Sequence, residues 1–455
     1  MAYQTTNPYN NQVIKTYQNI SDADLAQALT ATHQQYQDWR SQPVSDRAVI
    51  LHRIAKLMRT EKTSLAKVVT QEMGKLIGES EDEVELCANI ADYFADHAAD
   101  FLKPTPLKTG IGEAYYQKQA LGVLFMVEPW NFPYYQIMRV FAPNFMIGNP
   151  LLLKHASNTP GSAAAFVEVI RRAGAPVASL INLFVDYDQV AKAIADPRVV
   201  GVALTGSERG GASVAQTAGA NLKKSTMELG GNDPFIILDD ADMTKVAAWA
   251  PAARLANAGQ ICAASKRFIV MADKYEDFLK LLKTAFAAVK PGDPMDRATT
   301  LAPLSSARSK ATLQKQVDAA IAGGAKVYYG NEKIDLSGQF FQPTILTDID
   351  QNNPVYNQEL FGPVASVYKV HSEAEAIQLA NDSSYGLGSA IFSEDTKHAQ
   401  AVASQIEAGM TFINRAWATL PELPFGGVKN SGYGREMYEL GFDAFVNEHL
   451  VVNAK

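Results

Sequence analysis

Residues 199–211 read VVGVALTGSERGG, an apolar run that stops at a Thr-Gly-Ser turn and continues into a segment compatible with a helix. The same order recurs upstream of it. The runs LFMV (124–127), PLLLKHA (150–156) and LINLFV (180–185) are strand-like and are separated by helical patterns. Strands that alternate with helices are typical of parallel strands joined by crossover helices. This part of the chain therefore predicts an α/β fold with a doubly wound parallel sheet.

The rest of the chain extends this pattern to two large domains and a small third element. Residues 22–102 place apolar side chains at helical spacing, and FIILDD (235–240), KRFIVM (266–271) and VASVYKV (364–370) begin a second set of strands. We expect a first domain from residues 1–105 and 125–229 and a second α/β domain from residues 230–430. The apolar residues 447–453 lack a hairpin partner nearby. We expect them to pair with residues 113–127, so that 106–124 and 431–455 form a protruding β element.

Composition narrows the class of protein. The chain has 455 residues, 41 basic against 48 acidic, and a net charge of −7, which offers no general attraction for nucleic acid. The opening MAYQTTNPYNNQ lacks the apolar core of a signal peptide, and no run approaches the roughly 20 apolar residues of a membrane helix. With two cysteines and seven scattered histidines, the chain predicts neither a disulfide framework nor a metal site. We expect a cytoplasmic protein without membrane contact.

Four short segments carry the chemistry: PWNFP (129–133), ELGG (228–231), GQIC (259–262) and ELFGP (359–363). Within them Asn131, Glu228 and Cys262 are 97 and 34 residues apart. In order and spacing these segments resemble the aldehyde dehydrogenase superfamily, and the resemblance runs along essentially the whole chain. It implies a dinucleotide-binding first domain, a second domain that carries a nucleophilic cysteine, and a β element for oligomerisation as a homodimer or homotetramer.

The residue types suit oxidation of an aldehyde to a carboxylic acid. A cysteine thiolate adds to an aldehyde carbon better than a hydroxyl, so Cys262 is the expected nucleophile. By resemblance, the Asn131 amide and the Cys262 backbone N–H hold the oxyanion. Loss of hydride to nicotinamide leaves a thioester, and Glu228 is the expected general base for the water that cleaves it.

Each residue also has an ordinary structural interpretation. A single cysteine is usually a small buried hydrophobe, and this remains our expectation for Cys87, which lies in the helical pattern VELCANIADYF. A Glu before two glycines is more often a solvated turn, and an Asn between prolines is a local hydrogen-bonder. Only the combination favours catalysis. Residue 264 is Ala, where some members of the family carry a second cysteine, so a regulatory disulfide is not expected.

The dinucleotide site does not follow the GxGxxG fingerprint, which is absent after every predicted strand. In its place, the turn at Thr205, Gly206 and Ser207 precedes a helix whose first N–H groups can bind a pyrophosphate. Gly206 and Gly211 match the GSxxxG cofactor pattern of the family. By resemblance, Glu359 and Phe361 hold the nicotinamide ribose and ring, and Trp130 lines the pocket.

Residues 154–157 (KHAS) bear on the choice of cofactor. By resemblance Lys154 binds the adenosine ribose, and many NAD-preferring relatives have Glu at the position of Ser157. A carboxylate there would repel a 2′-phosphate, whereas Ser is a donor. We therefore expect NADP to be preferred over NAD, with Lys154, Ser157 and Tyr187 near the 2′-phosphate. The alternative is that Ser157 only caps a turn.

The segment after Pro133 bears on the substrate. Asn131, Tyr135 and Arg139 are four residues apart and share one helix face, with Gln136 on a neighbouring face. By resemblance this face lines the aldehyde tunnel, and Arg415 lies in a loop that also reaches it. An arginine there favours an aldehyde that carries a carboxylate, and succinate semialdehyde is the simplest. The chain is most similar to the short, NADP-preferring succinate-semialdehyde dehydrogenases. The alternative is that Arg139 pairs with an acidic residue on the surface or at a subunit contact.

Three other functions are alternatives to this one. Within the family the alternatives are another short semialdehyde or a small aliphatic aldehyde. A cofactor-independent thiol hydrolase or acyltransferase would need a histidine base beside Cys262, and no histidine lies in a recognisable motif. A protein that kept only the fold would be expected to have lost Cys262, Glu228 or Asn131, and all three are present.

Overall fold

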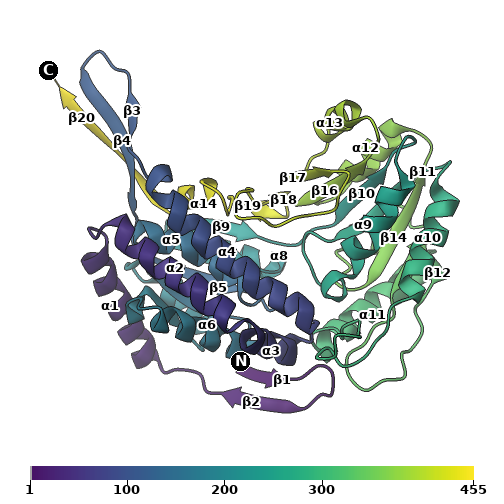
Figure 1. Ribbon diagram of the computed structural model, residues 1–455, viewed down its shortest axis with the longest axis horizontal. Helices are drawn as coiled ribbons and strands as arrows, with labels where there is room; N and C mark the ends of the chain where they lie inside the picture. Colours follow the sequence, from purple (N-terminus) through teal and green to yellow (C-terminus); the bar gives the residue numbers. More distant parts are fainter. Residues whose placement is uncertain (1–2, 455) are drawn as a thin grey trace.

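The computed structural model describes residues 3–454 and has two α/β lobes with a β arm that projects from the first (Figure 1). The first lobe contains a six-stranded sheet in the order β19-β9-β8-β5-β6-β7. Its strands are β5 (Val123–Glu128), β6 (Leu151–His155), β7 (Leu180–Asn182), β8 (Val199–Thr205), β9 (Lys224–Glu228) and β19 (Gly432–Tyr433). All neighbours are parallel except β19, which runs antiparallel to β9. The expected doubly wound sheet is confirmed.

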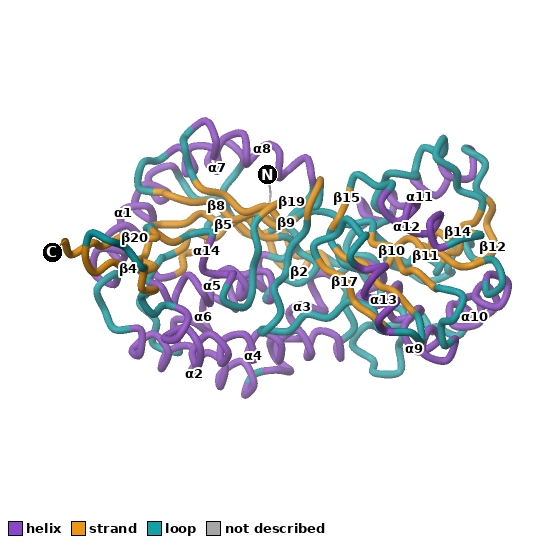
Figure 2. Tube along the Cα trace, turned by 90° about the horizontal axis from the view of Figure 1, so that it is seen from above, coloured by secondary structure: helices purple, strands orange, loops and turns teal. Residues whose placement is uncertain are grey.

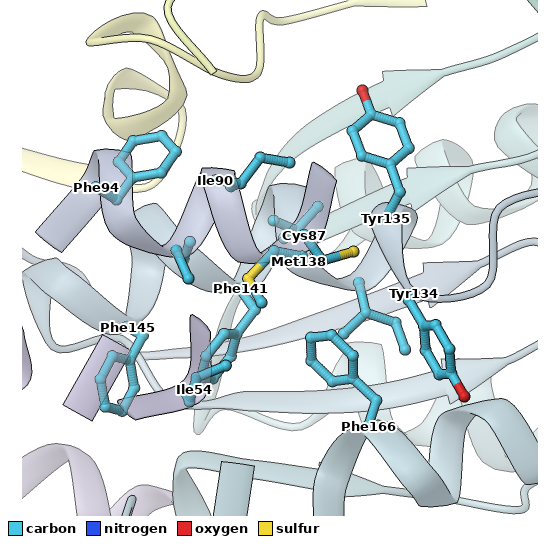
Figure 3. Close-up of a cluster of buried hydrophobic side chains, with 14 of the residues drawn as sticks. Ile54, Cys87, Ile90, Phe94, Tyr134, Tyr135, Met138, Phe141, Phe145 and Phe166 are labelled. Carbon is cyan, nitrogen blue, oxygen red and sulfur yellow. The ribbon is translucent and has the colours of Figure 1, made fainter. Parts of the chain in front are cut away.

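Helices cover both faces of this sheet (Figure 2). One face carries α1 (Asp22–Trp39), α7 (Tyr187–Ala195) and α8 (Glu208–Ala220), and the other carries α2 (Val44–Thr60), α3 (Lys62–Met73), α4 (Ile77–Phe101), α5 (Tyr135–Ile147) and α6 (Pro160–Arg172). The fully buried α5 packs on α4 through Met138 and Phe141, and Cys87 lies in the same core (Figure 3). Cys87 is therefore a packing residue, as its helical pattern predicts.

The second lobe holds a seven-stranded sheet in the order β12-β13-β14-β11-β10-β16-β17. Its strands are β10 (Asp233–Ile237), β11 (Ser265–Met271), β12 (Lys326–Tyr329), β13 (Thr344–Thr347), β14 (Val364–Val370), β16 (Gly388–Phe392) and β17 (Met410–Ile413). Only β12 is antiparallel to its neighbour. The helices of this lobe are α9 (Met243–Leu255), α10 (Tyr275–Ala287), α11 (Ala307–Ala322), α12 (Glu373–Asn381) and α13 (Thr396–Ala403).

The projecting arm is a three-stranded antiparallel sheet. It consists of β3 (Thr105–Leu107), β4 (Gly112–Ala120) and the C-terminal strand β20 (Val446–Ala454), which pairs with β4 along its whole length. The pairing of the last strand is thus as expected, but its partner segment is shorter than residues 113–127. Residues 123–128 instead form β5 at the centre of the six-stranded sheet, because all but one of them are fully buried there.

Two further elements depart from the expected pattern. An N-terminal hairpin of β1 (Tyr3–Thr6) and β2 (Val13–Tyr17) was not anticipated, and residues 432–433 join the first sheet as β19 rather than the arm. Smaller elements are the 3-10 turns η1 (Val177–Ser179) and η2 (Ala256–Gly259), the strand pair β15 (Tyr385–Gly386) and β18 (Val428–Lys429), and α14 (Leu440–Asp443). No helix within residues 3–454 is long and apolar enough to cross a membrane.

Candidate active site

The site begins at the point where the first sheet reverses its strand order. From β5 the chain proceeds to β6 on one side, while β8 and β9 lie on the other. In open α/β sheets the crevice for a ligand opens at such a point, at the carboxyl ends of the strands. Pro129 to Asn131 follow β5 at this edge, and Gly206 and Ser207 follow β8. Both segments therefore reach the same crevice.

A cavity of about 630 Å³ occupies this crevice. Two of the expected cofactor residues, Gly211 and Glu359, do not line it. The others do: Trp130, Lys154, Ser157, Tyr187, Thr205, Gly206, Ser207 and Phe361. Ser207 caps α8, its hydroxyl accepting from the N–H of Gly210 at 3.3 Å. Gly211 does not line the crevice. It packs against Leu229, and a Cβ at Gly211 would come within 2.6 Å of that side chain. Its role is therefore to let α8 pack closely on the chain beyond β9.

Lys154 is a buried cation that suits a phosphate. Only 7% of it is exposed, burial lowers its pKa to about 8, and it forms no ion pair within residues 3–454. Its ammonium lies 5.9 Å from the ring centres of both Tyr3 and Tyr187. Arg308 of α11 lines the same cavity from the second lobe. Burying a lysine without a counter-ion is costly, so this arrangement fits an anionic ligand.

A second cavity, of about 260 Å³, continues the crevice towards the nucleophile. Asn131, Gln136, Cys262, Glu359 and Phe361 are among its lining residues. The rings of Trp130 and Phe361 meet edge to face here, with centroids 5.7 Å apart. Glu359 enters from the loop before β14, and its Oε1 accepts from the N–H of Gly231 at 3.0 Å. The ELGG and ELFGP segments are thus in direct contact.

A third cavity, of about 280 Å³, meets the second at Cys262 and Gln136. Most of its lining area comes from apolar and aromatic side chains, including Phe132, Tyr135, Trp417 and Phe425. Cys262 therefore lies between a crevice suited to a dinucleotide and a pocket suited to a small aldehyde. Tyr135 and Gln136 line this pocket as expected.

The GQIC segment is held by hydrogen bonds that explain its residue types. Gly259 has φ +76°, and a Cβ there would come within 2.3 Å of the Gly362 carbonyl. The buried Gln260 side chain donates to the Asn257 carbonyl at 3.1 Å and accepts from the N–H of Ser305 at 2.9 Å. The Asn131 amide donates to the Gln260 carbonyl at 3.1 Å. This fixes Asn131 against the loop that carries Cys262.

Burial and the charges around Cys262 together set the pKa of its thiol. Burial raises its pKa to about 12, while Lys266 and Arg139 act to lower it and Glu359 and Glu228 act to raise it. A reactive cysteine must lose its proton, so the two cations are the groups that favour catalysis.

Glu228 ends β9 as a buried carboxyl whose two oxygens accept no hydrogen bond from any residue between 3 and 454. Burial and the neighbouring Glu436 raise its pKa well above the usual value. A Cβ at Gly426 would lie 2.7 Å from its Oε1, so the glycine leaves room beside the carboxyl. Glu228 lines none of the three cavities, but its charge acts on Cys262. An unpaired, desolvated carboxyl near a nucleophile is suited to accept a proton.

Arg139 and Arg415 do not reach the pocket in which an aldehyde would bind. Neither lines the aldehyde pocket. Arg139 is 1% exposed and its Nε pairs with Glu436, while its Nη atoms donate to Tyr135 and Thr205 at 3.3 and 3.0 Å. Arg139 therefore pairs with an acidic residue, but the pair is buried within the chain and not on the surface or at a subunit contact, where the alternative had placed it. Arg415 is exposed and stacks near Trp249, so its expected contact with the pocket is corrected.

Two functional candidates escaped the sequence analysis. Glu436 lies in the C-terminal region assigned to the arm, and nothing local links it to Arg139. Lys266 contacts the backbone of Cys262 from β11, and the SKR sequence at the start of an otherwise apolar buried strand was the available signal. The residues between 3 and 454 contain no group of acidic, His and Cys side chains that could hold a metal ion.

Known proteins that resemble this chain in sequence and in structure indicate one family. The profile described as "Aldehyde dehydrogenase family" matches residues 1–451. A succinate-semialdehyde dehydrogenase [NADP(+)] of Deinococcus radiodurans is 45% identical over 99% of this chain and 94% of its own. The crystal structure of a Streptococcus pyogenes succinic semialdehyde dehydrogenase with NADP+ superposes with a TM-score of 0.99 at 56% identity, and each chain is covered completely. A Staphylococcus aureus betaine aldehyde dehydrogenase with NAD+ is 30% identical, with a TM-score of 0.96 and coverage of 100% and 92%.

Proposed function

Since the chain belongs to the aldehyde dehydrogenase family, we propose that it oxidises succinate semialdehyde to succinate with NADP. The observation that carries this proposal is the position of Cys262, which lines both the pocket suited to an aldehyde and the cavity continuous with the dinucleotide crevice. The two similar proteins described as NADP-dependent or solved with NADP+ support the substrate and the cofactor.

The first half of the reaction acylates Cys262. Its thiolate adds to the aldehyde carbon, and the negative charge that develops on oxygen is stabilised by N–H donors. The Asn131 amide has two N–H groups and uses one on the Gln260 carbonyl, so the other can hold the oxyanion with the backbone N–H of Cys262. NADP, when bound, supplies the acceptor for the hydride that leaves this carbon. Cys262 then carries the acyl group as a thioester.

The second half releases the acid. Glu228 takes a proton from a water molecule, the water oxygen attacks the thioester carbon, and Cys262 leaves as a thiolate. The carbon–sulfur bond breaks as the new carbon–oxygen bond forms. Both oxygens of Glu228 are buried and accept no hydrogen bond from residues 3–454, so a water that reaches them would find a free acceptor.

The 2′-phosphate of NADP fits the groups at residues 154–157. Lys154 would hold it in the crevice with the hydroxyls of Ser157 and Tyr187, which line the same cavity. The phosphate would give the buried ammonium the counter-ion that it lacks among the described residues.

Replacing Ser157 by Glu is expected to reverse the cofactor preference. Two like charges about 4 Å apart repel by roughly 1 kcal/mol in bulk water and by roughly 4 kcal/mol near a protein surface. The ratio of kcat/KM for NADP to that for NAD should therefore fall by about tenfold or more. Initial rates with both cofactors measure this ratio, and the KM for the aldehyde is the internal control. An unchanged ratio would show that Ser157 only caps its turn.

Tyr135 links the substrate pocket to the buried Arg139. Its hydroxyl accepts from Arg139 at 3.3 Å, and burial raises its pKa to about 12, so it keeps its proton at neutral pH. That proton can be donated to a carboxylate in the pocket, with the arginine charge behind it. Tyr135 replaces Arg139 as the residue that would touch the substrate carboxylate, and Arg139 acts through it.

A panel of aldehydes tests both the substrate and this contact. The unaltered enzyme should show its highest kcat/KM with succinate semialdehyde, above a neutral aldehyde of similar length. Tyr135→Phe should raise the KM for succinate semialdehyde by about tenfold, the effect of losing a hydrogen bond to a charged group, with little change for the neutral aldehyde. Equal effects on both aldehydes would remove Tyr135 from carboxylate recognition. Preference of the unaltered enzyme for the neutral aldehyde would contradict the proposed substrate.

The arm suggests a homodimer or homotetramer. It carries exposed apolar side chains on β3 and β20 and in the turn between β3 and β4, among them Leu107, Ile111, Leu450 and Val452. An exposed antiparallel arm of this kind is a ready surface for a second copy of the chain. We place the enzyme in the cytoplasm, where the two free thiols, Cys87 and Cys262, would stay reduced.

A further inference from the structure

Lys266 is a fully buried cation in direct contact with the nucleophile loop. It is the second residue of β11 and is 1% exposed. Its ammonium donates to the carbonyl of Ile261 at 2.9 Å and to that of Cys262 at 2.5 Å. The same ammonium lies 3.1 Å from Oε1 of Glu359. Two of the three N–H donors of the ammonium are used on these carbonyls, and the Glu359 carboxylate lies beside it as an ion pair.

The partner of Lys266 reaches the cavity beside the nucleophile. Glu359 lines that cavity with Cys262 and Trp130. Both of its contacts above, from Lys266 and from the N–H of Gly231, use Oε1. Its Oε2 lies over Gly230, where a Cβ would come within 2.7 Å of it. Lys266 and Gly231 therefore hold the Oε1 oxygen of Glu359, while its Oε2 lies beside Gly230, which also lines the cavity.

Four charged groups face Cys262 from different elements: Lys266 on β11, Arg139 on α5, Glu359 before β14 and Glu228 at the end of β9. Arg139 is already paired with Glu436. Lys266 is the strongest of the groups that oppose the effect of burial on the thiol. Its charge is in turn offset by Glu359, so the thiolate depends on the balance between these two residues.

We propose that Lys266 is a positioning residue that couples the carboxylate of Glu359 to Cys262, by holding the loop carbonyls and by stabilising the thiolate. The coupling rests on the proposed function and on the role that the family resemblance gives Glu359, which is to hold the nicotinamide ribose through its hydroxyl groups. Donors at Glu359 disperse its charge and leave more of the ammonium charge to act on the thiolate. Occupation of the cofactor site thereby makes the nucleophile more reactive.

Alkylation by iodoacetamide, followed at Cys262 by peptide mass spectrometry across a range of pH, tests this without aldehyde turnover. Cys87 is completely buried and serves as an unreactive internal control in the same sample. Lys266→Met should shift the alkylation profile to higher pH by about one unit, which is about tenfold slower alkylation at a fixed pH below the midpoint. Lys266→Arg should keep most of the charge and lie close to the unaltered protein.

Glu359→Gln should move the profile in the opposite direction, because it removes the charge that offsets Lys266. Saturating NADP should shift the midpoint of the unaltered protein downward by more than that of Lys266→Met. The proposal is overturned if Lys266→Met leaves the profile unchanged, if both substitutions shift it in the same direction, or if NADP acts equally with and without Lys266. Should Lys266→Met fail to fold, Glu359→Gln decides alone, and any result but a downward shift overturns the proposal. Since the thiol profiles without NADP need no substrate, they would stand even if succinate semialdehyde were not oxidised.

Discussion

Replacing Cys262 by Ala should lower kcat/KM for aldehyde oxidation by roughly 10⁴-fold or more, because no other group can form the covalent intermediate. Cys262 is the one cysteine that lines the pocket and the nucleotide crevice's inner cavity. NADPH formation measures the loss. Binding of NADP should persist, since most of the residues proposed to hold it lie between Lys154 and Ser207 and are unchanged, and fluorescence quenching by NADP checks that the variant is folded.

The matched control is Cys87→Ala. Cys87 lies on α4 and packs into the core of the first lobe. Burial raises the pKa of its thiol well above the usual value. This substitution should cost some free energy of unfolding and leave the oxidation rate within a few-fold. If Cys262→Ala retained activity within tenfold of the control, the thioester chemistry would have to be abandoned.

Replacing Glu228 by Gln should separate the two halves of the reaction. Acylation does not need the base, so a first, fast formation of up to one NADPH per active site is expected in stopped-flow measurements. Steady-state turnover should then be slower by roughly 10²- to 10⁴-fold, the usual contribution of a general base. A uniform slowing of the burst and the steady state would place Glu228 in the first step instead.

The pH dependence of the unaltered enzyme has a definite sign. Burial and Glu436 raise the pKa of Glu228 well above the usual value, and only the ionised carboxylate can accept the proton of water. Deacylation should therefore rise with pH as Glu228 ionises. Glu228→Gln should abolish this dependence of the deacylation rate, since the amide does not titrate in this range.

The sequence predicted the parallel sheet well because its central strands are apolar on both faces. Strands β5, β6 and β8 are buried almost throughout, and each is polar or charged only at its carboxyl end. Strand β9 reads KSTME, in which only the Met is apolar, so no apolar run predicts this strand although it carries Glu228. Within residues 22–102 the helical spacing continues unbroken from residue 46 to residue 75, but the helix breaks at Glu61, where no Gly or Pro marks the end of α2.

The site was predictable as far as local segments carried it. PWNFP, ELGG, GQIC and ELFGP converge because PWNFP, GQIC and ELFGP lie in loops that reach the cavity beside Cys262, while ELGG leaves the end of β9 at the same place. The role of Arg139 was not predictable in the same way. Its position on the helix face of Tyr135 was correct, but its partner Glu436 is 297 residues away and is brought to it only by the packing of the C-terminal region beside α5. Long-range ion pairs leave no periodic signal in a sequence.

The same reasoning applies to Lys266. Its strand was predicted, and its charge in that strand was visible, but the identity of its acceptors depends on how the GQIC loop folds back. Two non-glycine residues with positive φ, Asn257 and Ala258, precede that loop and turn it. Periodicity and propensity do not foresee such a turn.

Intact-mass and peptide mass spectrometry of Glu228→Gln, quenched after mixing with succinate semialdehyde and NADP, tests the central claim most directly. The account predicts that one succinyl group per chain accumulates as a thioester, that it maps to the peptide containing Cys262, and that hydroxylamine removes it. It also predicts that no adduct forms when NADP is replaced by NADPH, because the hydride then has no acceptor. A protein that forms NADPH in the burst but carries no acyl group on Cys262 would contradict the account.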